Sequence, residues 1–377
     1  MRAGTETMHV LTIIGNRPQF VKLAAVTALL REDHRETLVH TGQHHDSELS
    51  GVFFDQLSLP PPDVDLGISG GGNSSQTGRM LAALEPLVVE YAPDLILVYG
   101  DTNSTLAGAL AAAQANVPLA HVEAGLRSFD RTMPEEINRV VCDALGALLL
   151  VPSESAAANL AREGVTGEVV VTGDVMGDIV LRMRDALEPG AARASLGIGD
   201  GEYILLTAHR AANVDDPERL AALVELIESL RLPVVFPVHP RTAARLAEFG
   251  LGDRLRDATG VTLLPSLGYG ETIALAAGAR AVLTDSGGLQ KEAVWLGTQC
   301  LTMRSVTEWP ETVESGWNTL VELDPARVRE ALAAGPPAGE PPALYGAGTA
   351  GRAVVEALSA YAGRRGNARG AKVESAS

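Results

Sequence analysis

The chain has 377 residues, more than a single hydrophobic core usually supports, so two domains are expected. Hydrophobic residues make up 46% of it and aromatic residues only 4%, which is typical of a soluble globular protein with an aliphatic core. A formal net charge of -17 argues against the broad basic surface that nucleic acids or anionic membranes require. We therefore expect neither among its partners.

The N-terminus and the cysteines indicate a cytoplasmic location. Residues Met1–His9 form a polar extension without the apolar core of a signal peptide, and no apolar run approaches the ~20 residues that span a bilayer. Only Cys142 and Cys300 occur, and they lack metal-ligand spacing, as expected in a reducing compartment.

From Val10 onward, apolar runs of strand length alternate with runs of helical length. The first half has strand-like runs at Val10–Ile14, Thr37–His40, Leu95–Tyr99, Leu119–Val122, Leu148–Val151 and Glu168–Thr172, and helical runs at Phe20–Leu30, Leu81–Tyr91, Leu106–Gln114 and Glu135–Leu145. This alternation predicts an α/β domain with a parallel sheet.

The alternation restarts after Gly190. Strand-like runs fall at Tyr203–Ala208, Val234–Val238, Val261–Leu264, Ala281–Thr284 and Gln299–Met303, and helical runs at Pro217–Leu230, Arg241–Phe249, Thr272–Ala277 and Leu289–Leu296. We therefore expect two Rossmann-like domains: residues 10–175, to which a helix at 352–362 returns, and residues 176–351. The polar segment 363–377 is expected to be disordered.

Six polar clusters directly follow apolar runs of strand length. They are Gly15-Asn16-Arg17-Pro18, Gly100-Asp101-Thr102, His121-Val122-Glu123, His209-Arg210, His239-Pro240 and Asp285-Ser286-Gly287-Gly288. Ligands of open α/β sheets bind beyond the carboxyl ends of the strands, so these clusters predict one shared cleft.

Carboxylates are unusually frequent at these strand ends. Asp101 and Glu123 have no capping role to explain them, and we interpret them as groups that move protons. Glu135 and Glu136 follow Pro134, where acidic residues also stabilise a first helical turn, so both a functional and a capping role stay open for them.

Other strand ends have the features of a phosphate site. The turn that holds Arg17, with Lys22 one helical turn later, can present cations and backbone donors, or it can be an ordinary tight turn. The glycine turn after Asp285 leads into a helix on which Glu292 could bind ribose hydroxyls, with simple packing as the alternative. His209 and His239 end two strands and could bind phosphate, or simply hydrogen-bond to the backbone.

These residues together resemble a known family, the non-hydrolysing UDP-N-acetylglucosamine 2-epimerases. The motifs that carry the resemblance are Gly-Asn-Arg-Pro at 15–18, Thr-Gly-Gln-His at 41–44, Gly-Asp-Thr at 100–102, His-Val-Glu-Ala-Gly-Leu-Arg at 121–127, Met-Pro-Glu-Glu-Ile-Asn-Arg at 133–139, His-Arg at 209–210, Pro-Val-His-Pro at 237–240 and Asp-Ser-Gly-Gly-Leu-Gln-Lys-Glu at 285–292. They occur in order from about Val10 to Ala362.

The resemblance implies an enzyme of GT-B architecture with a UDP-sugar in the cleft, no cofactor and no metal, and a homodimeric assembly. The implied reaction interconverts UDP-GlcNAc and UDP-ManNAc. It removes the C2 proton and expels UDP, leaving a 2-acetamidoglucal. UDP then adds back while the opposite face of C2 is protonated.

Residue by residue, the resemblance assigns roles to matching positions. Asp101, Glu123 and Glu135 correspond to catalytic acids, and His209 to a catalytic histidine at the leaving phosphate. Arg139 is implied to orient the carboxylates at the substrate. The UDP-binding positions are Arg17, Lys22, His239, Ser286, Gly287, Gly288 and Glu292, and Gln43 and His44 match a second-site or substrate contact.

Four residues depart from the commoner family pattern: Gln19, Ala212, Thr272 and Trp309. They bear on the sugar more than on the reaction, and some relatives that act on UDP-2,3-diacetamido sugars share the tryptophan. The alternatives are therefore an epimerase of such a sugar, a hydrolysing epimerase that releases UDP and ManNAc, a GT-B glycosyltransferase, and a non-catalytic UDP-sugar-binding regulator.

Overall fold

The computed structural model describes residues 7–43, 59–184, 186–199 and 201–374, with side chains for all of these except 365–374. The chain divides into two compact units. Unit 1 comprises the residues up to Ile179 together with those from Tyr345 onward, and unit 2 comprises Val180–Leu344. These limits differ by a few residues from the expected domain boundaries. His9, expected in the N-terminal extension, already belongs to the first strand.

Unit 1 is built on a parallel sheet, in which seven strands lie within the described residues in the order β3-β2-β1-β4-β5-β6-β7. They are β1 (His9–Ile14), β2 (Arg35–His40), β3 (Val64–Asp65), β4 (Leu95–Tyr99), β5 (Leu119–Val122), β6 (Leu148–Val151) and β7 (Glu168–Val171). The chain leaves β1 toward β2 on one side and resumes at β4 on the other. This reversal places a topological switch point beside the carboxyl ends of β1 and β4, where ligands of such sheets bind.

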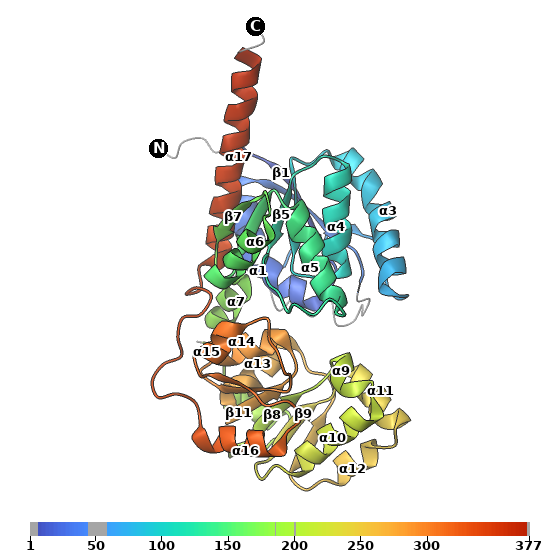
Figure 1. Cartoon of the computed structure of the whole chain (residues 1–377), viewed down its shortest axis with the longest axis vertical. Helices are drawn as coiled ribbons and strands as arrows, with labels where there is room; N and C mark the ends of the chain where they lie inside the picture. The colour runs from blue at the N-terminus through green and yellow to red at the C-terminus, as the bar shows by residue number, and fades with distance from the viewer. Residues whose placement is uncertain (1–6, 44–58, 185, 200, 375–377) are drawn as a thin grey trace. The chain divides into compact units, whose positions relative to one another are not determined.

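Helices cover the sheet of unit 1, as Figure 1 shows. They are α1 (Arg17–Asp33), α3 (Asn73–Tyr91), α4 (Asn103–Gln114), α5 (Pro134–Leu145), α6 (Glu154–Glu163), α7 (Val175–Arg184) and α17 (Ala350–Glu374). The alanine-rich α4 lies close to the sheet, since a Cβ at Gly108 would approach Val98 to 2.8 Å. Small residues therefore set the spacing of this layer.

Unit 2 repeats the same plan with a second parallel sheet, whose described strands run in the order β10-β9-β8-β11-β12-β13. The strands are β8 (Ile204–Thr207), β9 (Val234–Pro237), β10 (Val261–Leu264), β11 (Ala281–Thr284), β12 (Gln299–Thr302) and β13 (Asn318–Leu320). The helices are α8 (Pro189–Ser195), α9 (Ala211–Val214), α10 (Pro217–Glu228), α11 (Pro240–Glu248), α12 (Gly252–Asp257), α13 (Tyr269–Gly278), α14 (Gly287–Trp295), α15 (Pro310–Glu314) and α16 (Pro325–Ala334).

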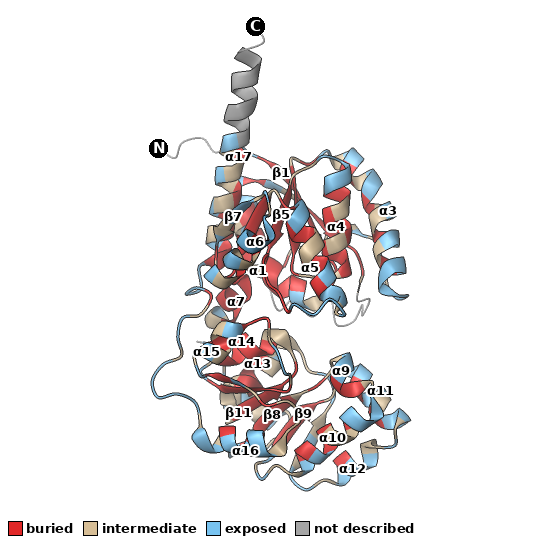
Figure 2. Ribbon diagram, viewed as in Figure 1, coloured by how far each residue is buried: buried red, intermediate tan, exposed pale blue. Residues whose placement is uncertain are grey.

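The sheet of unit 2 is buried on both faces. Leu206 and Phe236 pack in the core on one face, whereas the adjacent Leu205 and Val235 pack in the core on the other. Parallel strands covered on both sides need apolar residues at every position, which explains their continuous apolar runs. Figure 2 shows the strands buried and the outer faces of the helices exposed.

The C-terminal helix α17 belongs to unit 1, to which the chain returns after unit 2. The buried carboxylate of Asp178 accepts hydrogen bonds from the amides of Ala350 (2.9 Å) and Gly351 (2.8 Å) and so caps the start of α17. A Cβ at Gly351 would collide with the carbonyl oxygen of Ala25, so α17 lies directly against α1.

The predicted strands and helices are present, with shifts of a few residues at most ends and a larger one at α3, which begins at Asn73 and not at Leu81. One difference is the tail: we expected 363–377 to be disordered, but α17 continues to Glu374. Polarity suggested disorder there, yet alanine, arginine, lysine and glutamate are also good helix formers and no proline interrupts them. Helix α6 was not predicted from the sequence. Its buried residues are Ala156 and Leu160, and two apolar positions are too few to show helical periodicity.

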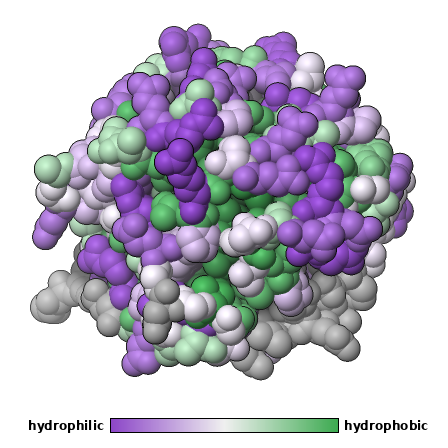
Figure 3. Space-filling model, turned by 90° about the horizontal axis from the view of Figure 1, so that it is seen from below, coloured by the Kyte–Doolittle hydropathy of each residue, from purple (hydrophilic) through white to green (hydrophobic). Residues whose placement is uncertain are grey.

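No helix within the described residues is both long enough and apolar enough to cross a membrane. Figure 3 shows a face of the molecule on which hydrophilic side chains surround smaller hydrophobic areas.

Candidate active site

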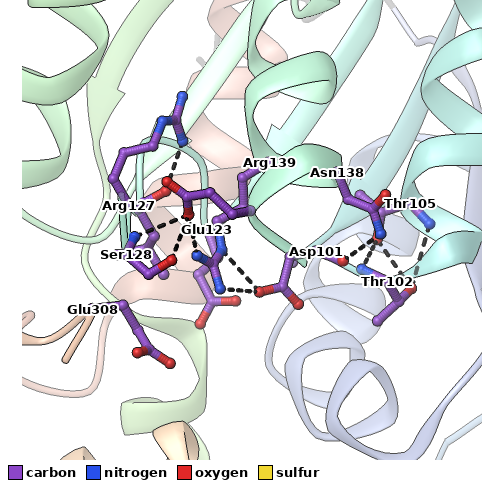
Figure 4. Close-up of polar contacts among 12 residues, drawn as sticks. Asp101, Thr102, Thr105, Glu123, Arg127, Ser128, Asn138, Arg139 and Glu308 are labelled. Atoms are coloured by element: carbon purple, nitrogen blue, oxygen red, sulfur yellow. Dashed lines mark hydrogen bonds and ion pairs between the residues drawn. The ribbon is translucent and has the colours of Figure 1, made fainter. Parts of the chain in front are cut away.

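Asp101 lies just after β4, in the turn that leads into α4. Its carboxylate oxygen Oδ2 accepts from Arg139 through both Nε (2.9 Å) and a terminal nitrogen (2.8 Å), while Asn138 donates to its backbone carbonyl at 2.9 Å. The side chain is still 29% exposed. Figure 4 shows Arg139 reaching across from α5 to Asp101. Asp101 is thus a firmly oriented carboxylate that solvent or a ligand can reach.

Glu123 follows β5 in a left-handed backbone conformation, with a φ of 69°. Such a φ is strained for a residue with a side chain and is often found at functional sites. Its carboxylate forms an ion pair with Lys22 of α1, and both side chains are almost buried. Gly100 has a left-handed backbone, with a φ of 63°, which favours glycine, and a Cβ there would crowd the Lys22 ammonium at 2.8 Å. Lys22, expected to bind UDP, therefore contacts a candidate catalytic carboxylate.

The two glutamates at the start of α5 differ in environment. Glu136 is buried and accepts from the amides of Ser128 (2.9 Å) and Phe129 (2.9 Å) and from Arg139 (2.6 Å). Glu135 is exposed in the same helical turn. Glu136 thus holds the loop at Ser128 and Phe129 in place and orients Arg139. Glu135 is accessible, and its catalytic role stays a prediction.

A buried polar network, which sequence analysis did not identify, lies beneath these carboxylates. It joins His121 of β5 to Asp143 of α5 at 2.7 Å and Arg127 to the same Asp143, also at 2.7 Å. Asp143 lies four residues after Arg139 and seven after Glu136, a spacing that places all three on one helix face. Charged residues at this helical spacing are the sequence signal that could have predicted the buried network.

The turn after β1 is held by Gln19, one of the four residues noted above as departures from the pattern of the resembled family. Its carbonyl oxygen accepts from the amide of Gly15 at 2.7 Å, and its Nε2 donates to the carbonyl of Tyr99 at 2.7 Å. A glutamate could not donate the second bond, so Gln19 joins the ends of β1 and β4. Arg17 occupies the first position of α1 in this turn.

The predicted second-site residues lie partly outside the described part of the chain. His44 is not described. Gln43 accepts from Ser104 at its amide (3.0 Å) and hydroxyl (2.7 Å), so its side chain is tied to α4. Residues 67–75 contain no arginine or lysine. Arg79 of α3 donates to the carbonyls of Ser69 and Gly70 and so supplies a cation beside this segment.

In unit 2, Asp285 organises the turn after β8. Its buried carboxylate accepts from the amides of His209 (3.1 Å) and Arg210 (3.0 Å), and its Oδ1 lies 3.4 Å from His209 Nδ1. Desolvation lowers the pKa of His209, although Asp285 opposes this shift. The imidazole is therefore mostly neutral near pH 7. The ring of His239 lies 5.3 Å from that of His209.

Ser286, Gly287 and Gly288 form the N-terminus of α14, where Ser286 is the N-cap. Helix N-termini favour anions. Arg210 lies close by, 3.2 Å from Glu308, and the carboxylate of Glu308 occupies the space that a Cβ at Gly287 would need. Arg304 pairs with the same carboxylate at 2.8 Å. The arrangement can bind a phosphate group through amides and guanidinium groups.

Glu292 lies further along α14 and accepts a hydrogen bond from the hydroxyl of Tyr269 at 2.9 Å. Tyr269 is also the first residue of α13, three residues before Thr272, which departs from the family pattern. Trp309, the other notable departure, is buried with its ring 3.9 Å from the Lys291 ammonium. It packs inside unit 2, and its effect on a ligand would be indirect.

Two parallel-sheet units, one with clustered carboxylates and one with a helix N-terminus suited to an anion, are typical of α/β enzymes of the GT-B type. Comparison with known proteins agrees with this class. The chain belongs to the UDP-N-acetylglucosamine 2-epimerase family, whose model matches residues 28–359.

Several relatives resemble the whole chain. A UDP-N-acetylglucosamine 2-epimerase homolog of Methanococcus maripaludis is 43% identical over 93% of this chain and 99% of its own. The UDP-2,3-diacetamido-2,3-dideoxy-D-glucuronate 2-epimerase of Pseudomonas aeruginosa is 44% identical over the same shares. The crystal structure of Methanocaldococcus jannaschii UDP-GlcNAc 2-epimerase in complex with UDP-GlcNAc and UDP matches with a TM-score of 0.86 and 39% identity, covering 93% of this chain and 99% of that one.

Proposed function

We propose that this protein is a UDP-sugar 2-epimerase that interconverts UDP-GlcNAc and UDP-ManNAc. The observation that carries the proposal is the pair of oriented carboxylates, Asp101 and Glu123, at adjacent strand ends of an epimerase-family chain. Proton removal from carbon requires a base held in fixed geometry, and each carboxylate here is held by a cation, Arg139 for Asp101 and Lys22 for Glu123.

The proposed reaction is an elimination followed by an addition. A carboxylate takes the C2 proton, the C2–H electrons form the C1=C2 double bond, and the C1–O bond breaks with its electron pair leaving on UDP. UDP oxygen then adds to C1 while an acid on the opposite face of C2 returns a proton. Asp101, Glu123 and Glu135 are the proposed acids and bases.

Unit 2 is proposed to bind UDP and to stabilise its departure. Ser286, Gly287 and Gly288 would bind the diphosphate at the N-terminus of α14, and Glu292 would accept from the ribose hydroxyls. A neutral His209 can donate a hydrogen bond to the leaving phosphate, as expected from the direction of its pKa shift. His239 and Arg17 are proposed as further UDP contacts.

Turnover in heavy water tests this function. We expect UDP-GlcNAc to yield UDP-ManNAc with deuterium at C2 of both epimers, because the same carbon is deprotonated and reprotonated in each direction. Free UDP and ManNAc as products would indicate a hydrolysing epimerase instead. Sugar transfer to an acceptor would indicate a glycosyltransferase, and binding without any turnover would indicate a regulator.

A second candidate substrate is a UDP-2,3-diacetamido sugar. It is favoured by the 44% identity with the Pseudomonas aeruginosa enzyme named for such a sugar. Comparison of kcat/KM for UDP-GlcNAc and UDP-2,3-diacetamido-2,3-dideoxy-D-glucuronate distinguishes the two. A ratio that favours the latter by tenfold or more would correspond to at least about 1.4 kcal/mol of transition-state discrimination.

We also propose that the enzyme is a cytoplasmic homodimer. A homodimer is expected from the resemblance to its family. A cytoplasmic location is supported by Cys142 and Cys300, which are both buried and unpaired with each other. Light scattering of the purified protein measures its molar mass and so tests the homodimer directly.

A further inference from the structure

The buried network of His121, Asp143 and Arg127 connects the two turns that carry Asp101 and Glu123. His121 Nδ1 lies 2.7 Å from Asp143 Oδ1, and His121 Nε2 lies 2.6 Å from the carbonyl oxygen of Gly100. A carbonyl oxygen can only accept, so Nε2 is the donor in the second contact. Burial alone would raise the pKa of Asp143, but its bonds to His121 and the charge of Arg127 bring it below its usual value. Asp143 is therefore an ionised acceptor at the centre of the network.

The charged members of this network are paired. Arg127 binds Asp143 at 2.7 Å and forms a two-bond pair with Glu163, at 2.7 and 2.6 Å. His121 and Arg127 thus both contact Asp143, and Arg127 also contacts Glu163. Buried charges are tolerated when they are paired and hydrogen-bonded in this way. No member of the network is an isolated buried charge.

Its outer contacts reach the backbone of both catalytic turns. His121 holds the carbonyl of Gly100, the residue before Asp101. Asp143 Oδ2 accepts from the amide of Gly125 at 3.0 Å, two residues after Glu123. Gly100, Glu123 and Gly125 all have a positive φ, of 63°, 69° and 79°. Glycine adopts a positive φ without strain, but for Glu123, which has a side chain, such backbone persists only where surrounding contacts enforce it.

We propose that Asp143 and His121 form a positioning pair that sets the relative placement of the Asp101 and Glu123 carboxylates. This inference rests on the proposed epimerase function. Neither residue needs to touch the substrate. The pair acts through the Gly100 carbonyl and the Gly125 amide, and a displacement of about 1 Å at a reacting group can cost on the order of 10²-fold in rate.

The main test is Asp143→Leu, which keeps much of the side-chain volume but removes both acceptor oxygens. The Gly125 amide and His121 Nδ1 then lose their shared partner, so the two turns are no longer tied to each other. We expect kcat per folded molecule to fall by about 10²-fold, with KM and the affinity for UDP nearly unchanged. With substrate deuterated at C2, the isotope effect on kcat should rise, because proton transfer becomes more rate-limiting.

Asp178→Leu is the matched control. Asp178 is also a buried aspartate of unit 1 whose carboxylate accepts from two backbone amides, but those amides belong to Ala350 and Gly351 in α17. This variant should lose stability without changing the isotope effect. An Asp143→Leu enzyme that matches Asp178→Leu, with lower stability but wild-type kcat and isotope effect, would overturn the positioning role.

Two substitutions of His121 provide an independent test if Asp143→Leu does not fold. A glutamine amide reaches the place of Nε2 and can still donate to Gly100, whereas an asparagine amide reaches only the place of Nδ1. His121→Gln should therefore retain more turnover per folded molecule than His121→Asn, and the reverse order would overturn the inference. A wild-type chain that epimerises no UDP-sugar would overturn the proposed function itself, and this inference with it.

Discussion

At the residue scale, His34 connects three elements and makes stability depend on pH. It caps α1, its Nδ1 accepts from the amide of Met8 at 3.3 Å, and its Nε2 bonds to Ser359 of α17 at 2.8 Å. An acceptor at Nδ1 requires the neutral ring, and desolvation lowers the pKa of His34 in the folded state. The unfolded chain therefore binds the proton more readily. This contribution to stability is complete above about pH 6.5 and is lost as the pH falls through the lowered folded-state value.

Urea unfolding measured between pH 5 and 8 checks this prediction. The free energy of unfolding should decrease below about pH 6.5, and His34→Gln should decrease less steeply because it removes one titrating group. Burial also lowers the pKa values of His9 and His209, so part of the slope will remain in the variant. A variant as steep as the wild type would show that His34 does not contribute.

At the element scale, the docking of α17 on α1 depends on one glycine. A Cβ at Gly351 would meet the carbonyl oxygen of Ala25, whereas Gly363 of the same helix has no atom within 4 Å of the corresponding position. Gly351→Ala should thus destabilise the protein by about 1–3 kcal/mol through overpacking. Gly363→Ala should stabilise it by about 0.5–1 kcal/mol, because alanine is the better helix former.

Thermal or urea unfolding of the two variants measures this difference directly. The comparison is internally matched, since both changes add one methyl group to the same helix. Equal shifts for both variants would mean that the contact between α17 and α1 is not tight at Gly351.

At the scale of the whole molecule, the two units have different proposed tasks. Asp101→Asn, Glu123→Gln and Glu135→Gln in unit 1 should each lower kcat by roughly 10²–10⁴ with little change in UDP affinity. Ser286→Ala and Glu292→Gln in unit 2 should instead weaken UDP binding. Calorimetric titration with UDP and steady-state kinetics separate these effects. Carboxylate variants that lose UDP binding as severely as activity would contradict the division.

The sequence by itself determined the class of fold and the strand ends at which polar residues gather. A buried parallel strand must be apolar at every position, and the glycines and polar residues that end it interrupt that run, so both signals are local in the chain. Asp101, Glu123, His209 and the turn after Asp285 were all found in this way. The same signals missed β3, β13 and α16, which are short or mostly exposed.

Only the tertiary structure decided how these groups are paired. The sequence separations are 101 residues for Lys22 and Glu123, and 22 for His121 and Asp143, and no local pattern connects such positions. Their contacts follow from the strand order, which places β1, β4 and β5 side by side, and from the packing of α5, whose Arg139 and Asp143 reach Asp101 and His121. The different environments of Glu135 and Glu136 arise for the same reason, because the orientation of α5 determines which glutamate faces the loop and which faces solvent.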